Sequence, residues 1–404
     1  MNDKKSMYKR IGNGYYIQVK IPLISGDFIE KLIPIRERFI IADNPKKFID
    51  TVPKYYGFCC IPSHTNYSQV FHNFYNTYHE LKHKPIKGEI KNTMILLEHI
   101  FEEHFDYGLD YLKLLYEKPT QMLPVLCLVS KERNTGKTTF LNWLKAIYGS
   151  NMTINKTEDF RSQFNSDWLS RLIIGVDEVL FERKEDQEKI KNASTAKIYK
   201  IESKGFDKQE TEFFGKIILL SNHERTFTKI DPGETRYWVR KIQVLESDDV
   251  DFLKKLEVEI PAFLYFLQNR QYTTKKVSRM WFSPMELRTE ALNRVISHSR
   301  DGLEVELANL IFDIIESMDL NNFQFCPTDL KSILGKSRYV NADQSRLKYI
   351  YKTLWKLTPA SNNLSYTRIQ MLTDGTLIPK KKTGRFYTVS KELLQEYYGD
   401  LLSM

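Results

Sequence analysis

Apolar residues form three short continuous runs in the middle of the chain. These runs, LPVLCLVS, RLIIGVDEV and KIILLSN, all lie between residues 121 and 245. Continuous apolar runs of this length are typical of parallel strands buried on both faces. Because helical stretches separate the runs, the pattern predicts an α/β core with a mostly parallel sheet and flanking helices.

The segments on either side of this core show other patterns. Residues 1–88 contain strand-like runs such as GYYIQVKIPLI, punctuated by glycine and proline, which predict an N-terminal α+β domain. Residues 89–120 carry apolar residues at helical spacing and lead into the core. Residues 246–300 are also expected to be mainly helical. An aromatic group within 71–78 could stack on bases, although local core packing is its more ordinary interpretation.

Residues 301–404 predict a separate C-terminal domain. Three helix-like stretches, GLEVELANLIFDIIESM, PTDLKSILG and ADQSRLKYIYKTLWKL, precede two strand-like runs, YTRIQML and RFYTVS, which PKKKTG joins. Three helices followed by a basic hairpin is the order of a winged helix, so we expect a winged-helix-like domain. The candidate DNA contacts in the hairpin are Lys380, Lys381, Lys382 and Arg385. A run of solvated charges is an equally good interpretation of the three lysines.

Composition narrows the class of protein. The net charge of +9 suits a polyanionic partner, but it is also ordinary for a lysine-rich protein. The four cysteines lack metal-ligand spacing and are expected to be reduced packing residues. The sequence shows no signal peptide and no apolar stretch long enough to span a membrane, so we expect a cytoplasmic protein without a membrane partner.

A candidate phosphate-binding loop follows the first apolar run. VLCLVS leads directly into KERNTGKTTF, and TTFLNWLKAIYG carries apolar residues on one helical face. Amides at a helix N-terminus, together with the helix dipole, attract phosphate. In the pattern G-x-x-x-x-G-K-[ST], Lys137 would reach the β- and γ-phosphates of ATP, and Thr138 would hold Mg²⁺. The candidate nucleotide-binding residues are Asn134, Thr135, Gly136, Lys137, Thr138 and Thr139.

The loop departs from this pattern at its first position, where Lys131 replaces glycine. The first glycine mainly permits a tight turn, whereas Gly136, which makes the close approach to phosphate, is retained. We therefore expect Lys131 to lie at the outer edge of the loop and to be dispensable. An exposed Gly-Lys turn before a helix is the alternative to a nucleotide site.

Polar residues at the ends of the other two apolar runs complete a candidate ATP-hydrolysis site. Asp177 fits the acid that holds Mg²⁺, and Glu178 fits the base that orients or deprotonates the attacking water. Asn222 could hydrogen-bond both the γ-phosphate and that water. Solvated acids and a turn-forming asparagine are the alternatives.

Two arginines follow in DPGETRYWVRKI. Arg236 could act across a subunit boundary and stabilise charge on the transferring phosphoryl group, and Arg240 is a weaker candidate. Arginines in surface salt bridges are the alternative for both.

The order and spacing of these motifs resemble the superfamily 3 helicases of viruses, phages and plasmids. NTGKTT (134–139) resembles motif A, IIGVDE (173–178) motif B and IILLSN (217–222) motif C, and Arg236 matches the arginine finger. FNSDWLSRLIIGVDE and KIYKIESKG are most similar to the phage and prophage primase-helicase branch. Over about residues 85–245, the resemblance implies a modified AAA+ core with a P-loop, ATP and Mg²⁺ as ligands, and a homo-hexameric ring.

The resemblance also implies a β-hairpin between motifs B and C that carries basic residues to DNA. KIYKIE, SKGFDK and TEFFGKIILL occupy that place. Lys204 at the tip maps to the leading DNA contact and Lys208 to a secondary one. A solvated basic turn is the alternative.

These features predict an ATP-dependent DNA helicase or translocase of phage or mobile-element replication, acting on single-stranded or forked DNA in a bacterial host. No primase signature is recognisable, so we expect priming to be supplied elsewhere, for example by a separate primase, or to be absent. Two alternatives stay open: an AAA+-like NTPase for nucleoprotein remodelling, packaging or defence, and a non-enzymatic DNA-binding initiator. Strand displacement would separate the first alternative from a helicase, and an ATPase assay would separate the second.

Overall fold

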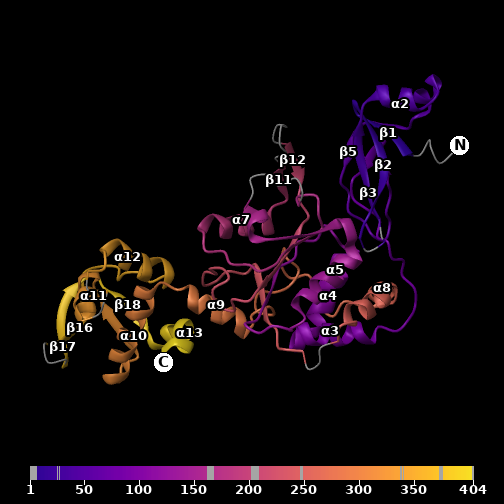
Figure 1. The fold of residues 1–404 in the computed structure, drawn as a ribbon. Coiled ribbons are helices and arrows are strands. Elements are labelled where there is room, and N and C mark those ends of the chain that lie inside the picture. The colour runs from indigo at the N-terminus through magenta and orange to yellow at the C-terminus, as the bar shows by residue number, and fades with distance from the viewer. Residues whose placement is uncertain are drawn as a thin grey trace. The chain divides into compact units, whose positions relative to one another are not determined.

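The chain folds into two compact units in the computed structural model (Figure 1). The core unit comprises Met1–Thr228 and Thr235–Leu292, and the C-terminal unit comprises Lys229–Glu234 and Asn293–Met404. No described helix is long and apolar enough to cross a lipid bilayer. The structure describes residues 7–24, 26, 28–161, 168–201, 209–245, 249–336, 339, 341–372 and 376–402.

A five-stranded parallel sheet forms the centre of the core unit. Its spatial order is β14-β8-β13-β10-β9. Every residue of β8, β10 and β13 is buried, and all four neighbouring pairs of strands are parallel, which confirms the parallel sheet that the apolar runs predict. Because the strands are parallel, the loops that follow them meet at one edge of the sheet. The strands are β8 (Val125–Val129), β9 (Met152–Asn155), β10 (Ile173–Val176), β13 (Lys216–Ser221) and β14 (Tyr237–Lys241).

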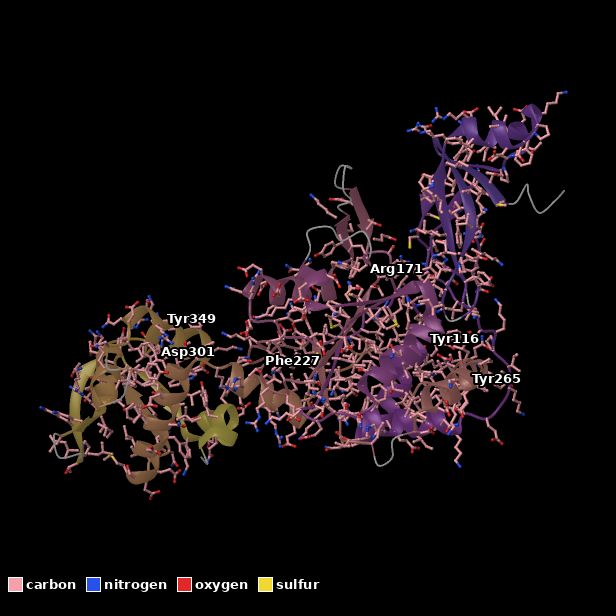
Figure 2. All side chains as sticks on the ribbon, viewed as in Figure 1. Tyr116, Arg171, Phe227, Tyr265, Asp301 and Tyr349 are labelled. Carbon is pink, nitrogen blue, oxygen red and sulfur yellow. The ribbon has the colours of Figure 1, made fainter. Side chains whose placement is uncertain are left out.

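Helices and their side chains pack against this sheet (Figure 2). Phe101 stacks on Trp238 of β14 with 5.3 Å between ring centroids, and a Cβ on Gly108 would meet the Phe101 ring at 2.3 Å. The two helices that carry Phe101 and Gly108 therefore need a glycine where they meet. The helices of the core unit are α3 (Lys91–Phe101), α4 (Phe105–Glu117), α5 (Lys137–Tyr148), α6 (Thr157–Arg161), α7 (Lys184–Thr195) and α8 (Phe252–Asn269), with short 3-10 turns at Glu102–His104 and Gly149–Asn151.

The N-terminal part of the core unit combines sheets and a helix, as the α+β prediction requires. A four-stranded sheet has the order β3-β2-β1-β4, and a three-stranded sheet has the order β5-β7-β6. Tyr8, Ile40 and Val52 form a small separate core. The elements are β1 (Tyr8–Ile11), β2 (Gly14–Pro22), β3 (Phe28–Ile35), α2 (Glu37–Asp43), a 3-10 turn at Lys46–Thr51, β4 (Lys54–Tyr55), β5 (Phe58–Cys59), β6 (Val70–Phe71) and β7 (Phe74–Asn76).

A two-stranded antiparallel hairpin lies between β10 and β13 in the chain, where the sequence predicts one. It consists of β11 (Ile198–Ile201) and β12 (Gln209–Glu212). The predicted DNA contacts Lys204 and Lys208 lie outside the described residues.

The C-terminal unit contains the three predicted helical stretches and a hairpin. In chain order the elements run helix, strand, helix, helix, hairpin, strand, helix. They are α10 (Gly302–Ser317), β15 (Asn322–Phe325), α11 (Pro327–Ile333), a 3-10 turn at Leu334–Lys336, α12 (Gln344–Tyr349), a π-helical turn at Ile350–Leu354, β16 (Leu364–Met371), β17 (Leu377–Gly384), β18 (Tyr387–Ser390) and α13 (Lys391–Leu402); α9 (Glu290–Ser299) precedes them.

The predicted pairing of the C-terminal hairpin is wrong. The partner of β16 is β17, which contains the PKKKTG sequence, whereas RFYTVS supplies β18, which pairs with β15. Strand β17 could not be recognised from the sequence because it contains three consecutive lysines. A strand of an exposed two-stranded hairpin needs no apolar face, so it shows no alternation of apolar and polar residues. Residues 246–300 are also less helical than predicted, since no helix covers 270–289.

Lys216, the first residue of β13, is buried and donates hydrogen bonds to the carbonyls of Pro119 and Phe214. Burial lowers its pKa from 10.5 to about 7. Between pH 7 and pH 10.5 the Lys216 side chain binds a proton in the unfolded chain but not in the folded chain, so the free energy of unfolding rises with pH. From pH 7 to pH 8.5 the deprotonation of Lys216 should raise the free energy of unfolding by about 1–2 kcal/mol.

Urea unfolding at these two pH values tests this expectation. Lys216→Met should lose most of the rise between pH 7 and pH 8.5, whatever its absolute stability. A variant that keeps the wild-type rise would show that Lys216 is charged throughout this window in the folded protein.

Candidate active site

A cavity of about 290 Å³ opens at the carboxyl edge of the parallel sheet. The loop between β8 and α5 forms one side, and the residues that follow β10 and β13 form the other. The structure thus brings together every predicted nucleotide-binding residue with Asp177, Glu178 and Asn222. The lining residues are Glu132, Arg133, Asn134, Thr135, Gly136, Lys137, Thr138, Thr139, Asp177, Glu178, Ser221 and Asn222.

The loop reaches α5 through two residues with left-handed backbone conformation. Asn134 has φ +53° and Gly136 has φ +78°. A Cβ at residue 136 would meet Leu245 at an ordinary 3.5 Å, so backbone conformation rather than space favours glycine there. Helix α5 starts at Lys137, and its unpaired N-terminal amides therefore lie in the wall of the cavity.

Lys137 is 93% buried at this helix start, since only 7% of its surface is exposed. Its Nζ donates a hydrogen bond to Thr135 Oγ1 at 3.0 Å. Burial lowers the pKa of Lys137, and the nearby carboxylates of Asp177 and Glu224 partly oppose that shift. Within the cavity lining, the Lys137 ammonium and the Asp177 carboxylate are therefore close enough to interact electrostatically.

The two acids lie just beyond the end of β10. The Asp177 amide donates to the Asn155 carbonyl at 3.0 Å, and the Glu178 amide donates to Asp177 Oδ1 at 2.9 Å. Glu178 has φ +54°, which is rare for a residue with a side chain. Such backbone strain often occurs at functional sites, and here it accompanies two adjacent carboxylates that line one cavity.

The segment after β13 contains Asn222, which lines the cavity, and Glu224, whose role the sequence did not predict. Glu224 accepts a hydrogen bond from the Lys131 amide at 3.2 Å and forms an ion pair with Lys241 at 3.5 Å. Glu224 therefore joins the start of the loop to the segment that carries Asn222. Local sequence gave no signal for this contact, because Glu224 and Lys131 are 93 positions apart.

Lys131 is exposed and does not line the cavity. Its backbone is not in the left-handed region, whereas that of Asn134 is. The first position of the loop therefore has no conformational need for glycine in this chain.

Two further contacts hold the outer side of the loop. His99 of α3 lies with Nε2 at 3.1 Å from the Thr135 carbonyl, a distance and partner that require Nε2 to carry the donating proton. The Leu245 amide donates to the Asn134 carbonyl at 2.9 Å. Segments before and after the sheet thus fix the loop, and neither was predicted from sequence.

Arg236 lies at the opposite edge of the sheet. Its carbonyl accepts a hydrogen bond from the amide of Val125, the first residue of β8, at 2.8 Å. A five-residue strand spans about 16 Å, so this backbone position is roughly one strand length from the loop that follows β8. Arg236 accordingly does not line the cavity of its own chain.

Arg240 is buried and forms ion pairs with Glu102 and Glu103, the first at 3.0 Å. The guanidinium hydrogen bond lowers the pKa of Glu103 to about 2. Arg240 therefore ties β14 to the turn after α3, in line with the salt-bridge interpretation.

The predicted DNA contacts of the C-terminal unit have different surroundings. Lys380 and Lys381 are exposed on β17. Lys382 donates to Asp329 Oδ1 at 3.0 Å, and Arg385 donates to the Ala360 carbonyl at 3.0 Å. These two side chains already have protein partners, so the four residues do not form one uniform basic surface.

Comparison with known proteins supports the fold. A family model described as "Family of unknown function (DUF5906)" matches residues 128–237, a stretch that contains the whole cavity lining. No curated protein matches significantly. The chain has a mixed α/β fold with a parallel sheet and flanking helices.

This fold is similar to that of solved structures of the NrS-1 C-terminal region, among others. One is described as "The apo structure of NrS-1 C terminal region (305-718)", with a TM-score of 0.63 and 15% identity over 93% of this chain and 96% of that chain. Another, "The A form apo structure of NrS-1 C terminal region-CTR(305-718)", has a TM-score of 0.61 and 16% identity, with the same shares covered. At such identities the likeness shows the fold alone.

Proposed function

We propose that the chain is an ATP-dependent DNA helicase or translocase that acts in the replication of a phage or mobile element. One observation carries this proposal: a single cavity is lined by a GKT-containing loop at a helix start, two adjacent carboxylates and a neutral amide. The motif resemblance to superfamily 3 helicases supports it. The fold, shared along most of its length with a region of NrS-1, agrees with the α/β core that the proposal requires.

The cavity residues fit ATP and Mg²⁺. The α5 amides and Lys137 would bind the β- and γ-phosphates. Thr138 and Asp177 would hold Mg²⁺, for which hydroxyl and carboxylate oxygens are suitable ligands. Bound Mg²⁺ would neutralise charge on the transferring phosphoryl group. Glu178 would orient or deprotonate the attacking water.

The strand order gives Asn222 a suitable place for its proposed role. Strand β13, which precedes Asn222, lies between β8 and β10, which precede the loop and the acids. A neutral amide between phosphates and a catalytic carboxylate can hydrogen-bond both sides without adding charge. This order supports a P-loop core of AAA+ type.

We further propose that the chain acts as a homo-hexameric ring. Arg236 lies about one strand length from its own cavity and would instead stabilise phosphoryl charge at the cavity of a neighbouring subunit. In such a ring, the β11–β12 hairpin would carry Lys204 and Lys208 to the DNA backbone, giving binding that is independent of sequence and sensitive to salt. The helices and hairpin of the C-terminal unit would form a winged-helix-like domain.

Strand displacement on forked DNA tests the helicase activity itself. The full chain should separate the strands only with hydrolysable ATP, and Lys204→Ala should slow separation more than it slows ATP hydrolysis. ATP hydrolysis without strand separation or movement along DNA, unchanged by Lys204→Ala, would instead favour a remodelling NTPase.

Lys131→Ala should change the dissociation constant for ATP by less than about threefold, because the Lys131 side chain is exposed and does not line the cavity, and its hydrogen bond to Glu224 is made by the backbone amide. Lys137→Ala should abolish measurable binding under the same conditions. Isothermal titration of both variants is the measurement. Equal losses in the two variants would show that the Lys131 side chain belongs to the site.

A further inference from the structure

A second cavity of the core unit, of about 620 Å³, lies away from the candidate active site and shares none of its lining residues. Strands of the N-terminal sheets form one wall. The end of α5 and the segments that follow α5 and precede β10 form the other. Its volume is in the range of small-molecule sites. The lining residues of interest are Tyr16, Phe58, Tyr75, Lys31, Lys145 and Arg171.

An aromatic group forms the first wall. The rings of Tyr16 and Phe58 meet edge to face at 5.2 Å, and those of Phe58 and Tyr75 at 6.4 Å. Phe58 nevertheless keeps 43% of its surface exposed. An exposed ring fixed by edge contacts offers a face on which a flat, aromatic ligand can stack.

Two cations line the second wall of the cavity. Lys145 Nζ donates to the carbonyls of Gly149 and Met152, the first at 2.8 Å. An ammonium group has three N–H donors, so two of them are used by these two acceptors from the described part of the chain, and the third can bind a ligand. Arg171, labelled in Figure 2, donates to the Ser150 carbonyl at 2.6 Å. Both cations are thus held by one short turn.

The charges around the cavity favour an anion. Burial and the neighbouring charge of Arg171 both lower the pKa of Lys145, so these two like charges repel each other. Among the described lining residues one is acidic, Glu30, and its carboxylate already accepts from Gln18 at 3.0 Å and pairs with Lys20 at 3.6 Å. An anionic group beside Lys145 and Arg171 would relieve their repulsion.

Direct hydrogen bonds join the two walls. The His79 amide donates to Asn151 Oδ1 at 2.9 Å, and Asn151 Nδ2 donates to the His79 carbonyl at 2.7 Å. Both residues are next to lining segments, and His79 itself lines the cavity. The aromatic and cationic groups are therefore held at a set separation before any ligand enters.

We propose that this second cavity binds one nucleotide unit, with its base on the Phe58 ring and its phosphate beside Lys145 and Arg171. Lys31, exposed at the rim, would contact a neighbouring phosphate. The unit is either a free nucleotide or a residue of a single-stranded nucleic acid. The second source rests on the proposed function, since a translocase must hold a strand; the site itself rests on the cavity alone.

Fluorescence anisotropy with a labelled oligothymidylate and the full chain tests this site. Phe58→Ala should weaken binding at least fivefold, as loss of one stacked base does. Lys31→Glu should weaken binding and reduce the slope of log affinity against log salt by about one. Phe74→Ala and Lys54→Glu are matched controls, because both residues are exposed on the same sheets and neither lines the cavity.

Photocrosslinking with a bromodeoxyuridine-substituted oligonucleotide locates the contact. Cross-linked peptides should contain Tyr16, Phe58 or Tyr75. Displacement of the oligonucleotide by millimolar dTMP would identify a free nucleotide as the ligand, and displacement by unlabelled oligothymidylate alone would identify a strand. The proposal is overturned if Phe58→Ala and Lys31→Glu bind like their controls and no cross-link maps to these peptides. Because neither measurement requires ATP hydrolysis, the result stands whether or not the chain is an ATPase.

Discussion

Glu178→Gln should lower the rate of ATP hydrolysis by about 10²–10⁴-fold, the usual contribution of a general base, while ATP binding stays close to wild type. Glutamine keeps the size of the side chain but cannot accept a proton from water. Steady-state hydrolysis together with isothermal titration of ATP gives both quantities.

Glu182→Gln is the matched control, because Glu182 follows the same strand and is exposed but does not line the cavity. It should hydrolyse ATP at the wild-type rate. Equal rates in wild type and Glu178→Gln would remove Glu178 from the catalytic role, and its left-handed backbone would then need another explanation.

Arg236→Ala should lower ATP hydrolysis by about 10³-fold or more, as loss of an arginine finger does. The decisive experiment mixes this variant with Lys137→Ala, which should also be inactive alone. In a mixed ring, an Arg236→Ala chain supplies an intact cavity and a Lys137→Ala chain supplies an intact arginine. Random mixing makes about a quarter of the interfaces competent, so activity should return.

A mixture of Lys137→Ala with Glu178→Gln is the matched control. Both defects lie in the cavity, which one chain supplies alone. No interface in that mixture is complete, so activity should stay absent. If mixing Arg236→Ala with Lys137→Ala also restores nothing, Arg236 does not act across a subunit boundary.

The central sheet and the cavity could largely be predicted from the sequence. Strands β8, β10 and β13 are buried on both faces and therefore appear as continuous apolar runs. The polar residues directly after them must lie at one sheet edge if the strands are parallel. Local pattern alone thus brought Lys137, Asp177 and Asn222 together.

Features set by long-range contacts could not be predicted. Strand β9, with a partly exposed MTIN sequence, gave no continuous apolar run, and the position of β14 beside β8 depends on pairing across more than a hundred residues. The contacts of Glu224 and His99 with the loop also join distant segments. Such contacts have no local hydrophobic period.

The missing first glycine illustrates the same limit. The sequence pattern has glycine at the position of Lys131, but the residues of this loop with left-handed backbone conformation are Asn134 and Gly136. Asparagine tolerates that conformation better than most residues with side chains. The loop therefore changes direction nearer the helix, and a lysine is acceptable at its start.

ATP hydrolysis measured with and without single-stranded DNA tests the central claim most directly. The wild-type chain should hydrolyse ATP, single-stranded DNA should stimulate the rate, and Lys137→Ala should abolish hydrolysis in both conditions. No hydrolysis in either condition, with Lys137→Ala indistinguishable from wild type, would contradict the account.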